Sequence, residues 1–284
     1  MPKIAMGLTA ALFAIAPAAA APRAADPAPV IAAERAFGAR AAQAGIAPSF
    51  LEFMTDDAII FAPDVVLAKA FYSQAPAAKP PGEGGTSLAW WPNFAGVARS
   101  GDLGFTTGPA TVNGKRGLFY FTVWVRQPDR GWKWVYDGGI DADGASAPGP
   151  EAPPIVLAPG DAKPLAPDLA MDQVRSAEIA LARQARTDVA AAYKAVLTTD
   201  ARLQGSPAAP ATTSAAVDRE LATRAKAIAF GPIGGGASKS GDLAWTFGDA
   251  KWQTGRGHYV RVWQRRAGKW ALVFDQIIKV DKPT

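Results

Sequence analysis

Acid–base chemistry is the first activity that the residue types in this chain suggest. Asp137 follows Tyr136 at the end of a predicted strand, and Tyr120 lies on the preceding strand. A carboxylate in apolar surroundings has a raised pKa and abstracts a proton, while a phenol donates a hydrogen bond to the resulting oxyanion. Asp137 and Tyr120 are therefore the candidate catalytic residues. The structural alternative is that Asp137 caps the rim of the sheet and pairs with Arg126.

Aromatic residues of the first half provide the candidate ligand-binding set, namely Trp90, Trp91, Tyr120 and Trp134. Large apolar side chains with one polar atom suit a pocket for a small apolar or amphipathic molecule. The same residue types also build cores and interfaces. Residues 119–124 place bulky groups on both faces of a strand, so we expect helices to cover one face and a partner to cover the other.

The composition excludes several other chemistries. The 284 residues contain no Cys and a single His, His258. Disulfides, thiolate metal sites, cysteine nucleophiles and His-rich zinc sites are therefore excluded, and Ser–His–Asp spacing is absent. Residues 234–236 are three glycines that lack the spacing of a phosphate-binding loop and lead into a strand. We expect no cofactor, no metal and no nucleic-acid partner.

The two halves of the chain differ in charge. Residues 30–141 hold ten basic and ten acidic side chains, whereas residues 172–284 hold seventeen basic and ten acidic ones, a net of +7. Arg261, Arg265 and Arg266 lie on one predicted strand and form a candidate basic surface for an anionic ligand, polymer or lipid headgroup. The alternative is a solvated strand face crossed by salt bridges.

One ordered set of motifs occurs twice. Residues 100–103 and 240–243 are both Ser-Gly-Asp-Leu. Further pairs in the same order are Ala33-Glu34 with Ala177-Glu178, Asp57-Ala58 with Asp200-Ala201, Trp90-x-Pro92 with Phe230-x-Pro232, and Tyr136-Asp137 with Phe274-Asp275. Because the motifs keep one order over about a hundred residues, we interpret the chain as a duplicated domain.

The repeat divides most of the chain into a first domain over 30–141, a linker over 142–171 and a second domain over 172–284. Residues 1–20 are predicted to be a signal peptide. Lys3, the apolar run Ile4–Ile15 and the small residues Ala18–Ala21 are typical of a secretory signal cleaved after Ala20. This predicts a periplasmic or secreted protein without a transmembrane segment. Seven prolines between 148 and 167 favour an extended linker.

Within the first half, the elements run from helices to sheet. Apolar spacing predicts helices near 30–41, 50–54 and 65–73. Strands are expected over 58–61, 88–91, 96–100, 103–107, 117–126 and 132–137. Asn113-Gly114 and residues 128–131 predict hairpin turns, and Gly268 plays the corresponding part in the second half. This order is typical of an α+β domain with its helices on one face of the sheet.

With its helical start, [WF]-x-P strand, G-D-L-[GA]-[FW]-T turn and closing strand ending in [FY]-D, each half resembles the nuclear-transport-factor-2-like superfamily. The SnoaL-like and ketosteroid-isomerase-like branches are the most similar. The resemblance covers Val30–Asp141 and Asp172–Lys279. It implies an α+β fold of two tandem cone-shaped domains. Each would be a curved antiparallel sheet wrapped on N-terminal helices around an apolar pocket.

The outer sheet faces of such domains commonly form dimers, so we expect the two copies to pack as a pseudo-dimer within a monomeric chain. The superfamily includes isomerases, cyclases, dehydratases and non-catalytic binding proteins, so the fold alone selects no activity. We expect an exported protein that binds a small apolar or amphipathic ligand in the first domain. The alternatives are an acid–base enzyme of isomerase, dehydratase or cyclase type, and a structural or partner-binding protein that uses the basic second copy.

Overall fold

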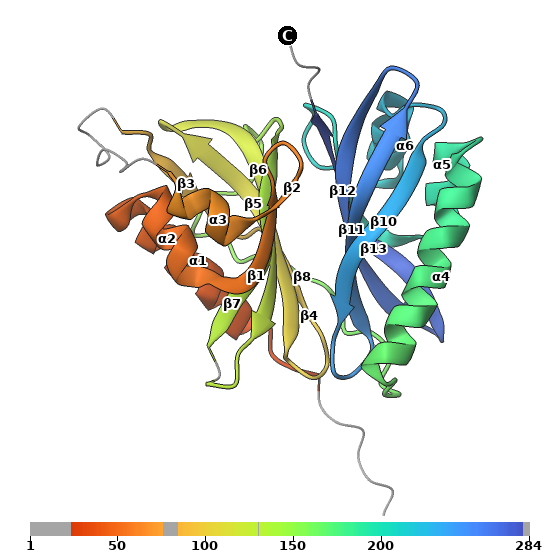
Figure 1. Cartoon of the computed structure of the whole chain (residues 1–284), viewed down its shortest axis with the longest axis horizontal. Coiled ribbons are helices and arrows are strands. Elements are labelled where there is room, and N and C mark those ends of the chain that lie inside the picture. The colour runs from red at the N-terminus through yellow and green to blue at the C-terminus, as the bar shows by residue number, and fades with distance from the viewer. Residues whose placement is uncertain (1–23, 76–84, 130, 281–284) are drawn as a thin grey trace, which may run out of the picture.

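The chain forms two α+β units that meet through their sheets (Figure 1). The computed structural model describes residues 24–75, 85–129 and 131–280, so the predicted signal peptide lies outside the described residues. The N-terminal unit contains α1 (Ala28–Ala44), α2 (Ile46–Phe53), β1 (Met54–Phe61), β2 (Val65–Leu67), α3 (Ala68–Ser73), β3 (Leu88–Trp90), β4 (Phe94–Val97), β5 (Leu103–Val112), β6 (Lys115–Arg126) and β7 (Trp132–Asp141).

The connecting segment contains β8 (Ile155–Val156), which pairs with β4 of the first sheet. The C-terminal unit contains α4 (Pro167–Ala185), α5 (Val189–Lys194), β9 (Leu197–Gln204), α6 (Ser214–Thr223), β10 (Ala229–Ala237), β11 (Leu243–Trp252), β12 (Gly255–Arg266) and β13 (Lys269–Val280). Helix α4 thus begins inside the segment that the prolines marked as linker. Within the described ranges, the structure has no helix that is long and apolar enough to cross a membrane.

Both sheets are mixed. The first sheet has the order β2-β1-β7-β6-β5-β4-β8, with β3 beside β5, and the second has the order β10-β11-β12-β13-β9. Strand β1 runs parallel to β7, and β9 runs parallel to β13, which corrects the expectation of purely antiparallel sheets. The physical reason is that hairpins impose antiparallel pairing only on strands they connect, and β1 and β7 are far apart in the sequence.

The long helix of each unit buries one stripe against its sheet. In α1 the buried positions are Val30, Glu34, Phe37 and Ala41, and in α4 they include Val174, Glu178, Leu181 and Ala185. This spacing of three and four residues places them on one helix face. Each stripe therefore carries a glutamate at the same place among apolar residues.

Local turn chemistry fixes the hairpins. Asn113 and Gly114 connect β5 to β6 with φ of 50° and 78°, and Ala267 and Gly268 connect β12 to β13 with φ of 49° and 76°. Two successive residues at positive φ match the right-handed twist of the flanking strands. The predicted turns at Asn113-Gly114 and Gly268 are confirmed.

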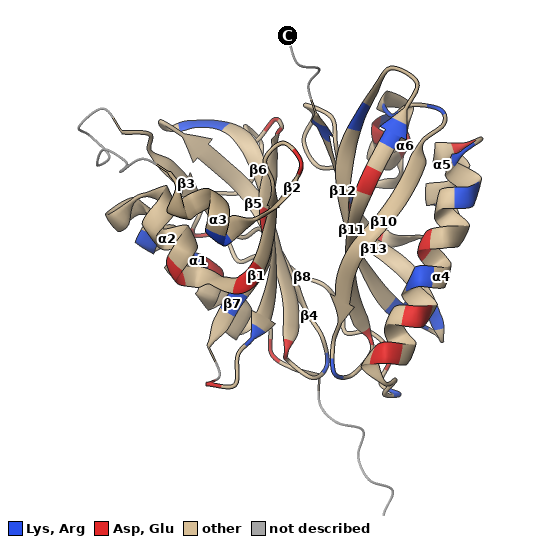
Figure 2. Cartoon of the chain, in the orientation of Figure 1, with Lys and Arg blue, Asp and Glu red and all other residues tan. Residues whose placement is uncertain are grey.

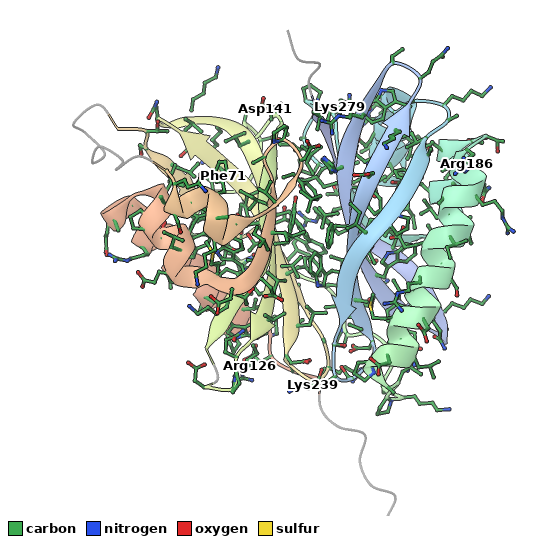
Figure 3. The ribbon with its side chains drawn as sticks, in the orientation of Figure 1. Phe71, Arg126, Asp141, Arg186, Lys239 and Lys279 are labelled. Carbon is green, nitrogen blue, oxygen red and sulfur yellow. The ribbon has the colours of Figure 1, made fainter. Side chains whose placement is uncertain are left out.

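The helices lie outside and the two sheets face each other (Figure 1). Side chains from both sheets fill the space between them (Figure 3). This seam, the apolar core shared by the two sheets, takes Phe94, Phe105, Phe121 and Tyr136 from the first and Trp245, Phe247, Val260, Val262 and Phe274 from the second. The rings of Phe121 and Phe274 stack with centroids 3.9 Å apart and planes 10° apart. The expected packing of the two units against each other is present.

Reciprocal hydrogen bonds join the two Ser-Gly-Asp turns at the edge of the seam. The backbone N–H of Ser100 donates to Ser240 Oγ at 3.1 Å, and the N–H of Ser240 donates to Ser100 Oγ at 3.1 Å. The N–H of Lys239 donates to Asp102 at 3.1 Å, and the N–H of Arg99 donates to Asp242 at 3.2 Å. Such paired contacts are those of a two-fold interface, here formed within one chain.

Candidate functional site

A cavity of about 290 Å³ lies in the N-terminal unit on the helix-covered face of its sheet. Its walls are mainly aromatic and aliphatic, and they include Phe50, Ile60, Tyr72, Trp90, Tyr120 and Asp137. Asp137 is the one charged residue among the described side chains that line it. The cavity therefore combines mostly apolar walls with one carboxyl group, a composition common in small-molecule sites.

Asp137 lies on β7 opposite Thr122 of β6, and 7% of it is exposed. The alternative of pairing with Arg126 does not hold, since Arg126 is opposite Trp132, roughly 13 Å further along the strand. No Lys or Arg nitrogen in the described part of the chain lies within 4.0 Å of the Asp137 carboxyl. Burial raises the pKa of Asp137 well above its usual value, and the nearby charge of Glu34 raises it further.

Tyr120 is a diagonal neighbour of Asp137 on the same sheet face, because it pairs with Gly139 two residues further along β7. Its hydroxyl is buried and has no hydrogen-bond partner among the described residues. Burial raises the pKa of Tyr120 far above its usual value, with the charge of Glu34 adding to the effect, so the phenol stays protonated. The structure thus brings the two candidate catalytic residues into one cavity.

Glu34 is a site residue that our sequence reasoning missed. It is fully buried on α1 and accepts hydrogen bonds from Trp90 Nε1 at 2.5 Å, from Trp124 Nε1 at 2.9 Å and from the hydroxyl of Thr106. Burial raises the pKa of Glu34, and these hydrogen bonds oppose the shift. The Trp90 ring lines the cavity while its Nε1 donates to Glu34. The glutamate therefore fixes the orientation of a ring in the cavity wall. A glutamate inside the apolar stripe of a helix was the available signal.

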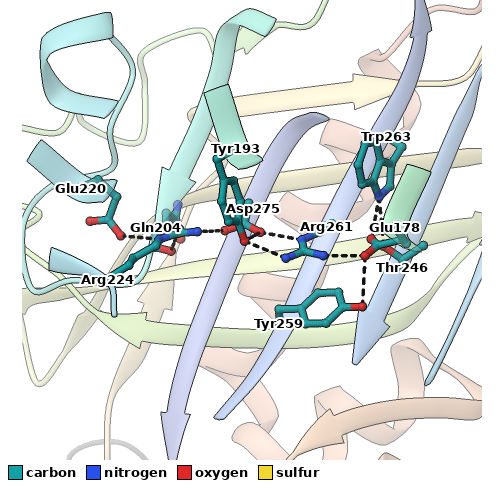
Figure 4. A network of polar contacts seen from close by, with 10 residues as sticks. All are labelled: Glu178, Tyr193, Gln204, Glu220, Arg224, Thr246, Tyr259, Arg261, Trp263 and Asp275. Atoms are coloured by element: carbon teal, nitrogen blue, oxygen red, sulfur yellow. Dashed lines mark hydrogen bonds and ion pairs between the residues drawn. The ribbon is translucent and has the colours of Figure 1, made fainter. Parts of the chain in front are cut away.

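The same two carboxylates occur in the C-terminal unit, where an arginine lies between them (Figure 4). Glu178 accepts from Thr246 Oγ1 at 2.6 Å and from Trp263 Nε1 at 2.9 Å, as Glu34 does from Thr106 and Trp124. Arg261 contributes Nη1 to Glu178 at 2.5 Å and Nε to Asp275 at 2.9 Å. This arginine lies opposite Asp275 on the sheet, the position that Thr122 has opposite Asp137.

Aromatic rings complete the filling of this second site. The Arg261 guanidinium lies 3.9 Å from the centre of the Tyr259 ring and 4.3 Å from that of Phe230. Tyr193 donates to Asp275 at 2.8 Å, and Arg224 Nη1 lies 2.7 Å from the same carboxylate. Both carboxylates therefore have a cationic partner, with the Arg261 guanidinium between them.

Arg261 is consequently no part of a basic surface. It is fully buried, while Arg265 lies 3.4 Å from Asp161 and Arg266 lies 2.8 Å from Asp200. The physical reason is that the strand pairs its arginines with acidic residues from distant segments, which the sequence spacing does not reveal. Figure 2 shows both acidic and basic positions along helix α4, where Arg175 pairs with Asp172 at 3.0 Å.

Two of the four predicted aromatic ligand-binding residues do not line the cavity. Trp91 donates from Nε1 to the carbonyl of Pro148 at 2.9 Å, and the Arg116 guanidinium lies 5.0 Å from its ring centre. Trp134 is fully buried in the core between sheet and helices. Trp90 and Tyr120 do line the cavity. Alternation along β3 and the adjoining residues sends Trp90 and Trp91 to different sides.

Comparison with known proteins found similar folds only. No family model and no curated protein match the chain. Similar solved structures include an NTF2-like protein from Cytophaga hutchinsonii, with 13% identity over 39% of this chain and 98% of that one and a TM-score of 0.32. A ketosteroid isomerase-like protein from Erwinia carotovora atroseptica has 16% identity over 39% of this chain and 96% of that one, with a TM-score of 0.34.

A third similar structure is a protein of unknown function with a cystatin-like fold from Nostoc punctiforme. It has 15% identity over 39% of this chain and 92% of that one, with a TM-score of 0.33. At these identities and TM-scores, the three likenesses carry no argument about activity. The function is therefore argued from the cavity itself.

Proposed function

We propose that the N-terminal unit binds a small, mostly apolar molecule that carries a hydrogen-bond acceptor such as a carbonyl group. The observation that carries this proposal is the unneutralised Asp137 in an apolar cavity, at the position where the C-terminal unit neutralises Asp275 with Arg261. A buried carboxyl without a cation is costly, and such groups cluster at functional sites. A structural role alone would favour the arrangement seen around Asp275.

The cavity offers such a ligand both apolar contacts and hydrogen-bond donors. Its aromatic walls remove apolar ligand surface from water, worth roughly 25 cal/mol per Å². The hydroxyl of Tyr120 donates a hydrogen bond, and burial, which raises the pKa of Asp137, favours the protonated carboxyl that also donates one, so an acceptor group on the ligand satisfies the buried phenol. The ligand expected is therefore a neutral molecule with one polar end.

The neutral ketone 2-acetylnaphthalene is a suitable probe for titration against the whole protein, followed by tryptophan fluorescence. Thr122→Arg would place a guanidinium beside Asp137, as Arg261 lies beside Asp275, and we expect it to abolish binding. The control Asp172→Asn changes an exposed residue of α4 and should bind as the wild type does. Equal binding by Thr122→Arg and wild type would contradict the proposal.

A second candidate is acid–base catalysis of the isomerase, dehydratase or cyclase type. The supporting observation is that Asp137 and Tyr120 line one cavity with raised pKa values, Asp137 as the base and Tyr120 as the donor to an enolate oxygen. Exchange of the methyl hydrogens of 2-acetylnaphthalene for deuterium, followed by NMR, tests this activity. Exchange that is lost in Asp137→Asn supports an enzyme, whereas binding without exchange leaves a binding protein.

We also propose that the two units are tandem copies of a nuclear-transport-factor-2-like domain and that the chain is exported. The matching glutamates Glu34 and Glu178, each bound to a Thr and a Trp, support the duplication. Export rests on residues 1–20 alone. Mass spectrometry of protein recovered from the periplasm and medium tests it, since cleavage after Ala20 removes a defined mass and an intact Met1 would contradict it.

A further inference from the structure

Among the described residues, a buried arginine between the two units lacks an acidic partner. Arg202 lies on β9, and 7% of its surface is exposed. Its Nη1 donates to Asn93 Oδ1 at 3.2 Å, and the guanidinium lies 4.1 Å from the centre of the Phe94 ring. Within residues 24–75, 85–129 and 131–280, no carboxylate lies within 4.0 Å of this guanidinium. Arg224, Arg261 and Arg266 of the same unit each have one.

The equivalent position of the N-terminal unit carries no charge. Because Asp57-Ala58 match Asp200-Ala201, the residue at the equivalent position of the N-terminal unit is Ile59, which packs against the seam. An aliphatic side chain therefore suffices at this place. Burial lowers the pKa of Arg202, yet a guanidinium remains protonated at neutral pH. The protein thus retains a buried charge, without an acidic partner among the described residues, where the N-terminal unit has an apolar residue.

A cavity of about 120 Å³ opens beside the guanidinium. It is formed by three parts of the chain, with Asn93 from the N-terminal unit, Ser146 from the connecting segment, and Arg202 and Thr212 from the C-terminal unit. Hydrogen bonds hold the connecting segment in place. Arg116 Nη1 donates to the carbonyl of Ala147 at 2.8 Å, and the N–H of Asp143 donates to the carbonyl of Pro207 at 2.8 Å.

We propose that this cavity binds a small oxyanion, with the guanidinium of Arg202 as its main ligand. A guanidinium presents parallel N–H donors that fit two oxygens of a phosphate, sulfate or carboxylate group. The hydroxyls of Ser146 and Thr212 and the Asn93 amide are further donors around the cavity. Its volume is roughly that of four water molecules at about 30 Å³ each, enough for one such group.

The cavity beside Arg202 also has an acidic residue in its lining. Asp143 lines it too, but this side chain is exposed and its Oδ1 accepts from the N–H of Ala145 at 2.9 Å. Its charge is therefore solvated, whereas that of Arg202 is buried. Since the cavity exists only where both units and the connecting segment meet, a bound oxyanion stabilises their association by linkage. This site is separate from the cavity at Asp137 and does not depend on its function.

Thermal unfolding and calorimetric titration of the whole protein test the site. Phosphate, sulfate and acetate are compared with chloride at equal ionic strength and pH 7.5. We expect a saturable rise in the unfolding temperature of the wild type with at least one oxyanion. Arg202→Met should lose this rise and should unfold at a higher temperature than the wild type in chloride, because it removes an unpaired buried charge. Arg202→Lys keeps the positive charge but loses the parallel N–H donors of the guanidinium, so it should bind the oxyanion at least about tenfold more weakly.

Arg266→Met is the matched control, since it removes a guanidinium that already pairs with Asp200 at 2.8 Å. It should retain the oxyanion response. The response to phosphate and sulfate compared with acetate distinguishes a tetrahedral oxyanion from a carboxylate, and either fits the site. The proposal is overturned if no oxyanion exceeds chloride in the wild type, or if Arg202→Met responds as the wild type does.

Discussion

Thr122 and Arg261 occupy the same position in the two sheets, each directly opposite a buried aspartate. Thr122 faces Asp137 across the β6–β7 pair, and Arg261 faces Asp275 across the β12–β13 pair. The longer side chain spans the distance to Glu178 and fills the space with its guanidinium. As a result, Asp137 lines a cavity with no Lys or Arg nitrogen within 4.0 Å among the described residues, whereas Asp275 is part of an ionic network.

Removal of the central cation of that network should be severely destabilising. Arg261→Met leaves Glu178 and Asp275 as buried carboxylates without their shared partner, and we expect a loss of about 3–5 kcal/mol in the free energy of unfolding. Urea unfolding measures it. Arg266→Met, at a partly exposed pair, should cost at most about 1 kcal/mol. Equal losses of unfolding free energy in the two variants would contradict the expectation that the buried network contributes more than an exposed ion pair.

The raised pKa of Asp137 predicts a pH-dependent effect of Asp137→Asn. The folded wild type holds the Asp137 proton to higher pH than the unfolded chain, so this stability is present at low pH and is lost as the pH rises through the folded pKa. Asn mimics the protonated carboxyl and does not titrate. The variant should match the wild type near pH 4 and exceed its unfolding free energy at pH 8, by about 1.4 kcal/mol per unit of pKa shift.

Urea unfolding of both proteins between pH 4 and pH 8 measures this difference. Asp172→Asn, which changes an exposed acid on α4, should show a difference from the wild type that varies little with pH. A constant difference for Asp137→Asn across the range would mean that the carboxyl titrates alike in folded and unfolded chains.

The stacked ring pair in the seam predicts that the two units depend on each other for stability. Phe121 is fully buried and stacks on Phe274 of the opposite sheet. Phe121→Ala should cost about 3–5 kcal/mol, through lost apolar contact and the cavity left behind. Ile179→Ala, at a residue 64% exposed on α4, is the control and should cost far less. A single cooperative transition in the wild type and separate transitions in Phe121→Ala would demonstrate the coupling, whereas equal costs would contradict it.

The features that could be predicted from the sequence are those that depend on near neighbours. Asn113-Gly114 predicts a hairpin because both residues tolerate positive φ. Alternation along residues 119–124 predicts two covered sheet faces because successive side chains point to opposite sides. The cavity partners Asp137 and Tyr120 could be paired for the same reason, since they lie on strands joined by one turn.

Contacts between distant segments could not be predicted in this way. Its aromatic type led us to predict Trp134 as a pocket residue. The parallel pairing of β1 with β7 and the packing of α1 instead place it in the core. Glu34 lies in the apolar stripe of its helix, but the residues that donate hydrogen bonds to it, Trp90 and Trp124, are 56 and 90 residues away, so the sequence does not show what makes its burial tolerable.

By itself, the sequence determined the two-fold repetition of motifs, the hairpins, the order from helices to sheet and the absence of thiol chemistry. These follow from residue types and from spacings within a strand, turn or helix. Only the tertiary structure decided which of the two matching aspartates is paired with an arginine. Arg261 reads as surface charge in its own strand, and its partners Glu178 and Tyr193 come from helices 83 and 68 residues away. Whether a charged side chain is exposed, paired or without a partner depends on which distant segments the fold places next to it. A local sequence pattern contains no information about those segments.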